Sequence, residues 1–383
     1  MTTDQFQALG GQGSSVNGGN GTLFFKSSAQ GLGDLVIDGT ALSTPSDSTP
    51  LPEGFVFDNL SIINGARVIA TSPIIVSNAM HITGGSVLTH PLSLETGLVI
   101  RAASLLLDTN SVIDVTARGY RGGQRDGNSN HHGLTTNETL GASVRAGGSY
   151  GGLGGQHTGM PNPVYGNATN PVHLGSGGSS NGGSTAGGSG GGRVDIWVPG
   201  TFTLEGTLRA DGGAGGSTAG GGSGGSILIR AGTIEGAGQI TSNGGAAQAG
   251  GGGGRIAIYY GVSSFDTNHV TASGGLGSTV SGSSGTVYFE MLAGGPGPFA
   301  APIAGGSSSM GAPVILACDV CDQGHLHLQW DGGEAPQGWL IEFSPSLTGT
   351  NWIVVDGPVS NVNWNTSIGE GAPPAGFFRL RQP

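Results

Sequence analysis

The sequence predicts an all-β repeat protein, a β-solenoid with glycine-rich turns. The chain of 383 residues contains 80 glycines, roughly one residue in five, against an average of about one in fourteen. Aliphatic and aromatic residues still make up 36% of the chain and charged residues only 10%, which is unlike a disordered, charge-solvated polymer. In addition, short apolar strands recur at a nearly constant interval, as the stacked coils of a solenoid require.

The repeat is clearest in the second half of the chain. Apolar segments entered through glycine begin there at intervals of 33, 29 and 31 residues: Gly192–Val198, Gly225–Arg230, Gly254–Tyr260 and Gly285–Phe289. A second strand follows in the same rhythm: Thr207–Gly213, Gln239–Gly245 and His269–Gly275. An earlier copy, Gly97–Ala102 followed by Ser111–Gly119, indicates that the array begins well before residue 190.

Alignment of the repeats predicts which side chains face the core, because side chains alternate across a strand. Two aligned columns are wholly apolar: Val194, Ile227, Ile256 and Val287, and then Ile196, Ile229, Ile258 and Phe289. In the second strand the inward column is Leu208, Ile240 and Val270. The positions between these columns are mixed and mostly polar, so each coil buries one apolar face against the next.

Glycine tracts separate the strands, for example at 220–225 and 250–254. Glycine permits positive φ and close backbone approach, so we expect turns at these tracts. An extended packing of the polyglycine II kind is a second possibility, since glycine has no side chain to obstruct a neighbouring segment.

The chain divides by composition into a solenoid, a linker and a C-terminal domain. Residues 1–22 are polar and read as an N-terminal cap or lead-in, and residues 23–291 as the solenoid. Residues 124–190 interrupt the rhythm, hold a rich polar and aromatic mixture, and are the candidate functional insertion. Residues 292–313 form a linker by composition, and alternating strands separated by turn signals predict a small β-sandwich over 314–383.

Two resemblances follow from these patterns. The glycine-entered strands with Asn-Gly-Gly or Asp-Gly-Gly turns resemble, over roughly residues 20–290, Gly-rich bacterial surface proteins of right-handed parallel β-helix type. Segments such as Trp339–Phe343, Asn351–Val355 and Phe377–Arg381 resemble the fibronectin-type-III-like C-terminal modules of bacterial exported proteins. The resemblance implies an extracellular or cell-surface location and an adhesive, matrix or glycan-associated role, and no particular enzyme activity.

The charge and hydropathy of the chain limit the classes of partner that we expect it to bind. The net charge is −11 with 13 Lys plus Arg, and no stretch concentrates the basic residues, which argues against nucleic acid. The sequence contains no run of about 18 apolar residues, so no membrane span is predicted. The first residues lack the basic and apolar regions of a secretory signal, so we expect that a leader has been removed or excised. Self-association and binding of a polysaccharide or cell-surface glycan remain open.

The two cysteines, Cys318 and Cys321, are predicted to form a local disulfide in an oxidising compartment. Two sulfurs cannot complete a four-ligand zinc site, and no βαβ context supports a redox motif. The adjacent His131 and His132 would point in opposite directions on an extended segment, so one metal would rarely take both. No metal or other cofactor is predicted.

The insertion and the residues just before it supply the candidate ligand-binding side chains. Arginine could neutralise the carboxylate of an acidic polysaccharide, and tyrosine or histidine could move a proton. The alternative is a solvated segment whose arginines and tyrosines pack over the side of the solenoid. The candidates are Tyr120, Arg121, Arg125, Asp126, His131, His132, Arg145, Tyr150, His157 and Tyr165.

The leading functional hypothesis is a non-enzymatic extracellular structural or adhesive protein, able to bind glycans or form filaments. An alternative is a polysaccharide lyase or glycoside hydrolase acting along the β-helix groove. Hydrolysis needs two carboxylates, and the candidates are Asp108, Asp114, Asp126, Asp195, Glu205, Asp211 and Glu235. A third hypothesis is an accessory glycan-binding module of a larger secreted protein. Catalytic residues are not assigned.

Overall fold

A computed structural model describes residues 6–296, apart from 12, 15–16, 41–47, 184 and 293–294, together with the backbone of six strands beyond residue 314. The chain separates into two units, Met1–Phe299 and Ala300–Pro383. Strand accounts for 37% of the structure and helix for 2%, the latter as short 3-10 turns such as Thr136–Glu138 and Thr267–His269. The prediction of an all-β protein is therefore confirmed.

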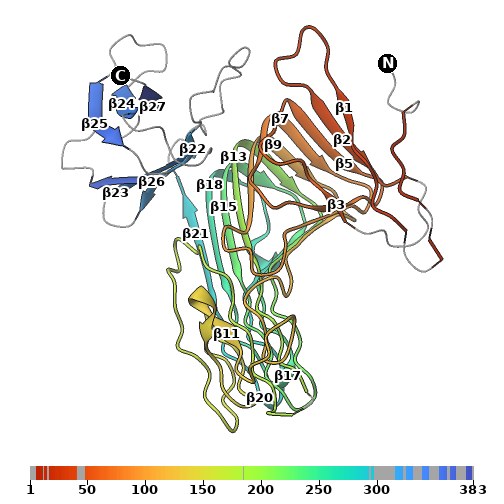
Figure 1. The fold of residues 1–383 in the computed structure, drawn as a ribbon, viewed down its shortest axis with the longest axis vertical. Helices are drawn as coiled ribbons and strands as arrows, with labels where there is room; N and C mark the ends of the chain where they lie inside the picture. The colour runs from red at the N-terminus through yellow and green to blue at the C-terminus, as the bar shows by residue number, and fades with distance from the viewer. Residues whose placement is uncertain are drawn as a thin grey trace. The chain divides into compact units, whose positions relative to one another are not determined.

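A ten-stranded sheet dominates the first unit (Figure 1). All neighbours in it run parallel except β1, which pairs antiparallel with β2 at the first edge. The strands lie in the order β1 (Leu23–Phe25), β2 (Asp34–Asp38), β5 (Asn59–Ile63), β7 (Ile74–Ile82), β9 (Leu98–Leu107), β13 (Arg193–Leu204), β15 (Ser226–Glu235), β18 (Arg255–Ser263) and β21 (Thr286–Met291), with β4 (Val56–Phe57) also pairing with β7.

A seven-stranded parallel sheet accompanies it, and the chain visits the two sheets alternately. Thus β13 leads into β14, β15 into β16, and β18 into β19. The strands of this second sheet are β3 (Thr49–Pro50), β6 (Arg67–Ile69), β8 (Val87–Thr89), β10 (Val112–Asp114), β14 (Thr207–Arg209), β16 (Gln239–Thr241) and β19 (Val270–Thr271).

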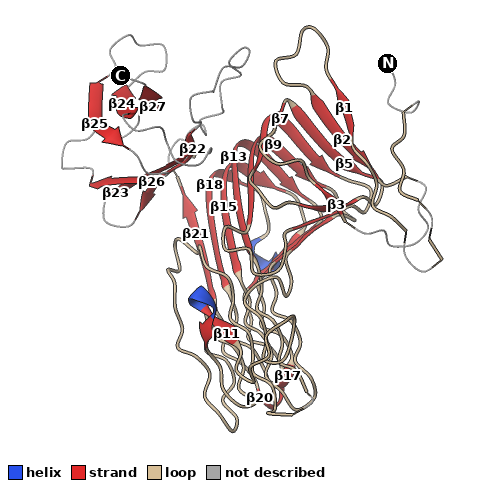
Figure 2. Ribbon diagram, viewed as in Figure 1, coloured by secondary structure: helices blue, strands red, loops and turns tan. Residues whose placement is uncertain are grey.

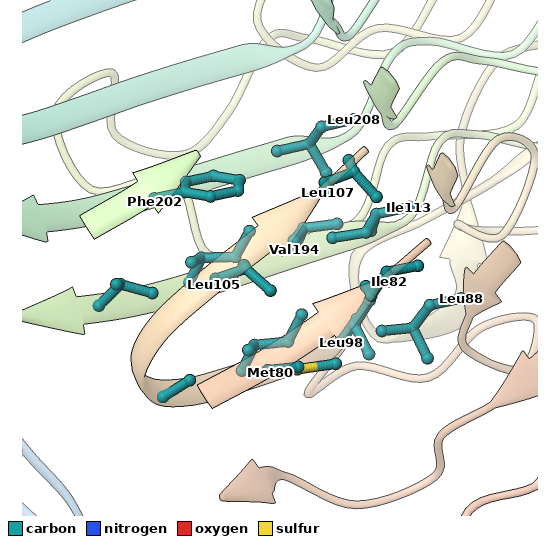
Figure 3. Packing of buried hydrophobic residues seen from close by; sticks show 14 of the residues in the cluster. Met80, Ile82, Leu88, Leu98, Leu105, Leu107, Ile113, Val194, Phe202 and Leu208 are labelled. Atoms are coloured by element: carbon teal, nitrogen blue, oxygen red, sulfur yellow. The ribbon is translucent and has the colours of Figure 1, made fainter. Parts of the chain in front are cut away.

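The core lies between the inward faces of these sheets. The residues of each predicted column are backbone partners on neighbouring strands. Val194 pairs with Ile227, Ile227 with Ile256, and Ile256 with Val287. The column of Leu208, Ile240 and Val270 is likewise in register in the second sheet. Figure 3 shows side chains from both sheets, including Ile82, Leu88 and Leu208, converging in one cluster. Their burial supplies the hydrophobic stabilisation.

The glycine-rich segments form a third region, seen as long loops in Figure 2. We call it the glycine array. It consists of extended tracts that lie alongside one another and bond through their backbones, at residues 118–123, 145–155, 174–180, 186–192, 210–216, 219–225, 242–247, 248–254, 272–276 and 280–285. Short strands β17 (Ala247–Ala249) and β20 (Gly277–Val280) belong to it, and the hairpin of β11 (Leu134–Thr135) and β12 (Thr139–Leu140) lies beside it.

Tract 219–225 has neighbours on all sides. Its N–H groups donate in turn to three tracts, and the cycle repeats every third residue: Gly220 to Ser179, Gly221 to Ala249, Gly222 to Gly213, Ser223 to Ser176, Gly224 to Gly252 and Gly225 to Ala210, over 2.8–3.0 Å. Its carbonyl groups accept from three further tracts, through Gly188, Gly148 and Gly245. A three-residue period without internal hydrogen bonds is that of the polyproline II helix.

The close approach of the tracts explains why they contain glycine. A Cβ atom at Gly221 would lie 2.1 Å from the carbonyl oxygen of Gly245, and one at Gly222 would lie 2.0 Å from that of Ser189. Serine occurs where its hydroxyl joins the network, as at Ser223, whose Oγ accepts from the N–H of Ser176 at 2.8 Å. The expectation of turns with positive φ is wrong at 220–225 and 250–254, because these residues are extended and no positive φ occurs among them.

The predicted insertion, 124–190, lacks long strands, yet it is not a separate loop. It supplies tracts 145–155, 174–180 and most of 186–192 to the array, and their glycines are largely buried. Extended segments that bond to several neighbours in different directions form no ladder, which is why the sequence rhythm of strands disappears here.

The second unit is antiparallel. Two three-stranded sheets have the orders β22-β23-β26 and β25-β24-β27. The strands are β22 (Ile315–Cys321), β23 (His325–Trp330), β24 (Trp339–Ser344), β25 (Ile353–Val359), β26 (Asn363–Ser367) and β27 (Phe377–Arg381). Cys318 and Cys321 both lie in β22, but their side chains are outside the described part, and so is most of the predicted linker, 292–313. The disulfide therefore stays a prediction.

Replacing Gly221 with alanine should destabilise the protein by at least about 1–3 kcal/mol, because the new Cβ would overlap a backbone carbonyl that cannot move alone. Chemical denaturation followed by circular dichroism measures this. Gly31→Ala is the matched control, since, its two chain neighbours aside, no atom of a described residue lies within 4 Å of the position that its Cβ would take. Equal stability of the two variants would contradict the packing of the array.

Candidate functional site

The candidate site lies on the outward face of the ten-stranded sheet, where polar residues alternate with the buried columns. We define the arginine face by six side chains on neighbouring strands. Arg101, Trp197 and Arg230 are consecutive cross-strand partners on β9, β13 and β15. The other members are Arg193, Asp195 and Arg255. The parallel register thus brings residues more than 150 positions apart onto one surface.

Asp195 is the centre of an ion cluster. Its Oδ1 lies 3.0 Å from Nη1 of Arg101 and 3.6 Å from Nη1 of Arg230, and its Oδ2 lies 3.5 Å from Nη2 of Arg193. Burial alone would raise the pKa of Asp195, but the three guanidinium groups, Arg101 foremost, lower the pKa to about 2. The carboxylate is therefore charged at every physiological pH.

Trp197 lies between two of these arginines. The Cζ atoms of Arg101 and Arg230 are 5.7 and 5.6 Å from its ring centroid, within the range of cation–π attraction. Because the two arginines come from the strands on either side of β13, they flank the indole. The ring thereby holds both guanidinium groups beside Asp195.

A segment from the predicted insertion covers part of this face; we call residues 156–174 the strap. Arg255 donates from Nε and Nη2 to the carbonyl oxygen of Tyr165, at 3.0 and 2.8 Å. The Tyr259 hydroxyl donates to the carbonyl of Thr169 at 2.7 Å, and the Ser226 hydroxyl to that of His173 at 2.5 Å. Side chains from two strands, β15 and β18, therefore anchor the strap at three points.

The arginine face places three guanidinium groups around the carboxylate of Asp195 and a fourth, that of Arg255, against the strap. Arg101, Arg193 and Arg230 share Asp195, and Arg255 forms no ion pair within the described residues. Burial lowers the pKa of His173, and the charge of Arg193 lowers it further. Glu95 acts in the opposite direction on His173.

Two of the predicted candidates, Tyr150 and Tyr165, join this face. The Tyr150 hydroxyl is 2.7 Å from the Ser226 hydroxyl, and Cζ of Arg255 lies 5.4 Å from the Tyr150 ring. The Tyr150 and Tyr165 ring centroids are 4.8 Å apart. Tyr120 is also buried, in the array, and donates to Oε2 of Glu95 at 3.0 Å. Burial, and then this bond, raise the pKa of Tyr120, so it stays protonated.

The remaining candidates do not converge on the face. Each has its own local contact: Arg121 with Glu138 at 3.1 Å, Arg125 with the Ala214 carbonyl at 3.1 Å, Asp126 with the Ser189 hydroxyl at 2.8 Å, His131 with the Ser180 hydroxyl at 3.1 Å, and His157 with the Thr158 hydroxyl at 2.9 Å. The Arg145 N–H donates to the Ser180 carbonyl. Nδ1 of His132 is buried without a hydrogen bond in the described part.

Sequence reasoning missed the centre of the site. Arg193, Asp195 and Arg255 fall at the mostly polar outward positions between the apolar columns, and of the three only Asp195 was considered, as a carboxylate for hydrolysis. Continuing the alignment by two residues would have placed Trp197, Arg230 and Tyr259 in a further outward column. Placing Arg101 required the register of β9 with β13, two strands that are separated in the sequence by residues 108–192.

The carboxylates proposed for hydrolysis are mostly held in local bonds. Asp108 accepts from the N–H of Gly84, Glu205 from that of Ala237, and Glu235 from the Thr203 hydroxyl. Asp114 and Asp211 are exceptional because both lie near Arg209 on the second sheet. Asp114 pairs with Nη2 of Arg209 at 2.6 Å, while Asp211 accepts from Thr241 and from the N–H of Asn243.

Within the described residues, no group of three or more His, Cys, Asp or Glu is placed to hold a metal ion. The described part also contains no helix of the length and apolar character needed to cross a bilayer. Comparison with protein-family models, curated proteins and solved structures finds no match to this chain. The arrangement of side chains therefore carries the functional argument.

His90 joins the site to the array. It is fully buried; its Nε2 accepts from the N–H of Arg193 at 3.2 Å, which leaves Nδ1 to donate to the Pro91 carbonyl at 2.6 Å. Burial lowers the pKa of His90 to about 4, and the Pro91 bond only partly opposes this. The ring is thus neutral in the folded protein at neutral pH.

Stability should fall as the pH drops from about 6.5 to about 4, because the unfolded chain takes up a proton at His90 that the folded chain refuses. A pKa lowered from 6.5 to about 4 corresponds to a loss of about 3 kcal/mol. Urea denaturation across this range measures it. His90→Gln should be less stable at neutral pH but should lose most of this pH dependence, the remainder coming from His173, whose pKa burial also lowers; an unchanged pH profile would contradict the assignment. The loss of stability that accompanies protonation of Asp195 is separate and occurs between about pH 3.8 and 2.

Proposed function

We propose that the protein is a non-enzymatic extracellular structural and adhesive module. The observation that carries this proposal is the glycine array, in which buried backbone groups are bonded to neighbours in several directions around tract 219–225. Such a network resists local opening, because one tract can separate only if its neighbours also lose their bonds. It suits a rigid support better than a site that must open and close on a substrate.

The finer fold proposed for the first unit is a right-handed parallel β-helix. The alternation of the chain between two parallel sheets supports it, as does the apolar register from β9 to β21. For the second unit we propose a fibronectin-III-like β-sandwich, supported by the two three-stranded antiparallel sheets. Both folds are common in stable exported scaffolds, in line with the extracellular location that we propose.

The adhesive part of the proposal rests on the outward arginine face. Flat sheet faces that carry aromatic and arginine side chains favour contact with extended polymers, since regular strand spacing repeats the contact along the sheet. Trp197 and Tyr259 are partly exposed beside Arg230. End-to-end association is a further possibility for a scaffold: Val287, on the last strand of the sheet, is 39% exposed, whereas its neighbour Ile256 is fully buried.

A glycoside hydrolase is the second candidate, favoured by Asp114 and Asp211. Burial alone would raise the pKa of both carboxyl groups. The hydrogen bond from Arg209 reverses this at Asp114, whose pKa is lowered, whereas the pKa of Asp211 is raised. Carboxyl groups whose pKa values move apart can act as acid and base. The ion pair with Arg209 and the bonds to Thr241 and Asn243 give these groups a structural role instead.

Incubation with acidic and neutral polysaccharides should release no reducing ends and no unsaturated sugars. Chromatography of the products and absorbance at the wavelength of the unsaturated uronate measure both activities. Release that disappears in Asp211→Asn would establish the hydrolase and overturn the structural proposal. Electron microscopy of the same preparation tests filament formation, which would appear as fibres of constant width.

A further inference from the structure

We infer that two copies of this chain associate through β21, the last strand of the ten-stranded sheet. The β21 strands of the two copies pair antiparallel across a two-fold axis at Phe289. This inference rests on the proposed structural function and names its partner, a second copy of the chain. No residue of the arginine face is needed for the contact.

The backbone of β21 has an open edge. The strand pairs in parallel with β18 and is the last in the order of its sheet, so no described strand pairs with its other side. The N–H groups of Thr286 and Leu292 donate to carbonyl groups on the side of β18, at 3.0 and 2.7 Å. Because peptide groups alternate in direction along a strand, those of Val287, Phe289 and Met291 point away from the sheet.

The side chains of these three residues form an apolar edge that is incompletely covered. Val287 and Phe289 continue the inward columns, and their partners on β18, Ile256 and Ile258, are at most 1% exposed. On β21, by contrast, Val287 is 39% exposed and Met291 is 69% exposed, and Phe289 is only partly buried against the core. An open apolar strand edge of this kind favours pairing with another chain.

The glycine array ends at the same place. The N–H groups of Gly250 and Gly253 donate to carbonyl groups of tract 280–285, and a Cβ at either glycine would lie 2.0 Å from a carbonyl oxygen. By the register of β18 with β21, the corresponding positions in the last tract are Ser281 and Ser284. Their side chains occupy the space that a further tract would need. A second copy therefore cannot continue the array, and the contact is confined to the sheet.

A two-fold axis at Phe289 matches the groups on this edge. Antiparallel pairing about the axis sets Val287 opposite Met291 of the second copy, so the outward peptide groups of both strands meet one another. On the other face of the sheet, Glu290 lies opposite Tyr288 of the second copy. The Tyr288 hydroxyl already donates to Oε2 of Glu290 in its own chain at 2.8 Å. The pairing thus brings a phenol to each carboxylate and sets no like charges directly opposite.

The first edge of the sheet differs from the last. Its strand, β1, has three residues and runs antiparallel to β2. The lead-in lies beside this end: the N–H of Gly21 donates to the Ala8 carbonyl, and the Asn20 carbonyl accepts from the Thr49 hydroxyl on β3. Contact between unlike ends would grow into a filament, whereas pairing of two like ends closes on itself. We therefore expect a dimer.

Sedimentation of the full chain over a wide range of concentrations tests the inference. We expect monomer at low concentration and dimer at high concentration, with no larger species. A monomer at every concentration, or fibres, would overturn the dimer and leave the structural function standing. Cleavage of a polysaccharide by the same sample would contradict the structural function, whatever the state of association.

Two substitutions at one position separate the backbone contact from the side chain. Met291→Pro removes an N–H that points away from β18, and the dimer loses this donor twice. Met291→Ala also shortens the side chain but keeps the N–H, and is the matched control. The dissociation constant of the dimer should be about tenfold higher for the proline variant than for the alanine variant. Equal constants in variants with unchanged circular dichroism would contradict the pairing.

A mixture of two charge variants tests the register. In its own dimer, Val287→Glu sets a carboxylate opposite Met291, and Met291→Lys sets an ammonium group opposite Val287. In the mixed dimer the two introduced charges face each other, and the original side chains meet at the other end of the pair. Native mass spectrometry should therefore show more mixed dimer than random association gives. A mixture of folded variants without this excess would overturn the inference.

Discussion

The structure depends on one constraint, that every buried peptide group needs a hydrogen-bond partner. The two sheets satisfy it by ladders between neighbouring strands, which are parallel except where β1 pairs with β2. The glycine array satisfies it differently, because each residue of tract 219–225 bonds to another tract in a direction that changes with every residue and returns after three. Neighbouring backbones must then approach closely from all sides, and a Cβ at Gly222 or Gly225 would overlap a carbonyl group.

This constraint connects the composition to the arginine face. Tract 145–155 is fixed in the array by bonds such as that from Gly148 to Gly221. Its Tyr150 reaches Ser226 on β15, and the strap that follows is bound by Arg255 and Tyr259. The array therefore positions the polypeptide that covers one part of the sheet and leaves Arg230 partly exposed. His90 completes the junction through its bond to the N–H of Arg193.

The sequence predicted the sheets well. The repeat period and the alternation of apolar and polar side chains together specify which residues pair on neighbouring strands. The register of the column from Val194 to Val287 was correct residue by residue, but Val287, on the last strand of the sheet, is 39% exposed and not buried as predicted. Extended packing of the glycine tracts was one of the two possibilities drawn from the sequence, but the partners of each tract could not be predicted, because a tract such as 219–225 contains almost no side chains and nothing in it specifies its six neighbours. The contact between Arg101 and Asp195 could not be predicted either. Their contact crosses 94 positions and depends on which strand pairs with β9 after the whole of 124–190 has been passed.

Amide hydrogen exchange tests the central claim most directly, because it reports the bonding of each backbone N–H. If the tracts are bonded as described, Gly221, Gly222 and Gly224 should be as strongly protected as Ile227 and Ile229 on β15, and they should open together with them. Exchange of tract 219–225 at the rate of an unstructured glycine peptide, while β15 remains protected, would contradict the account.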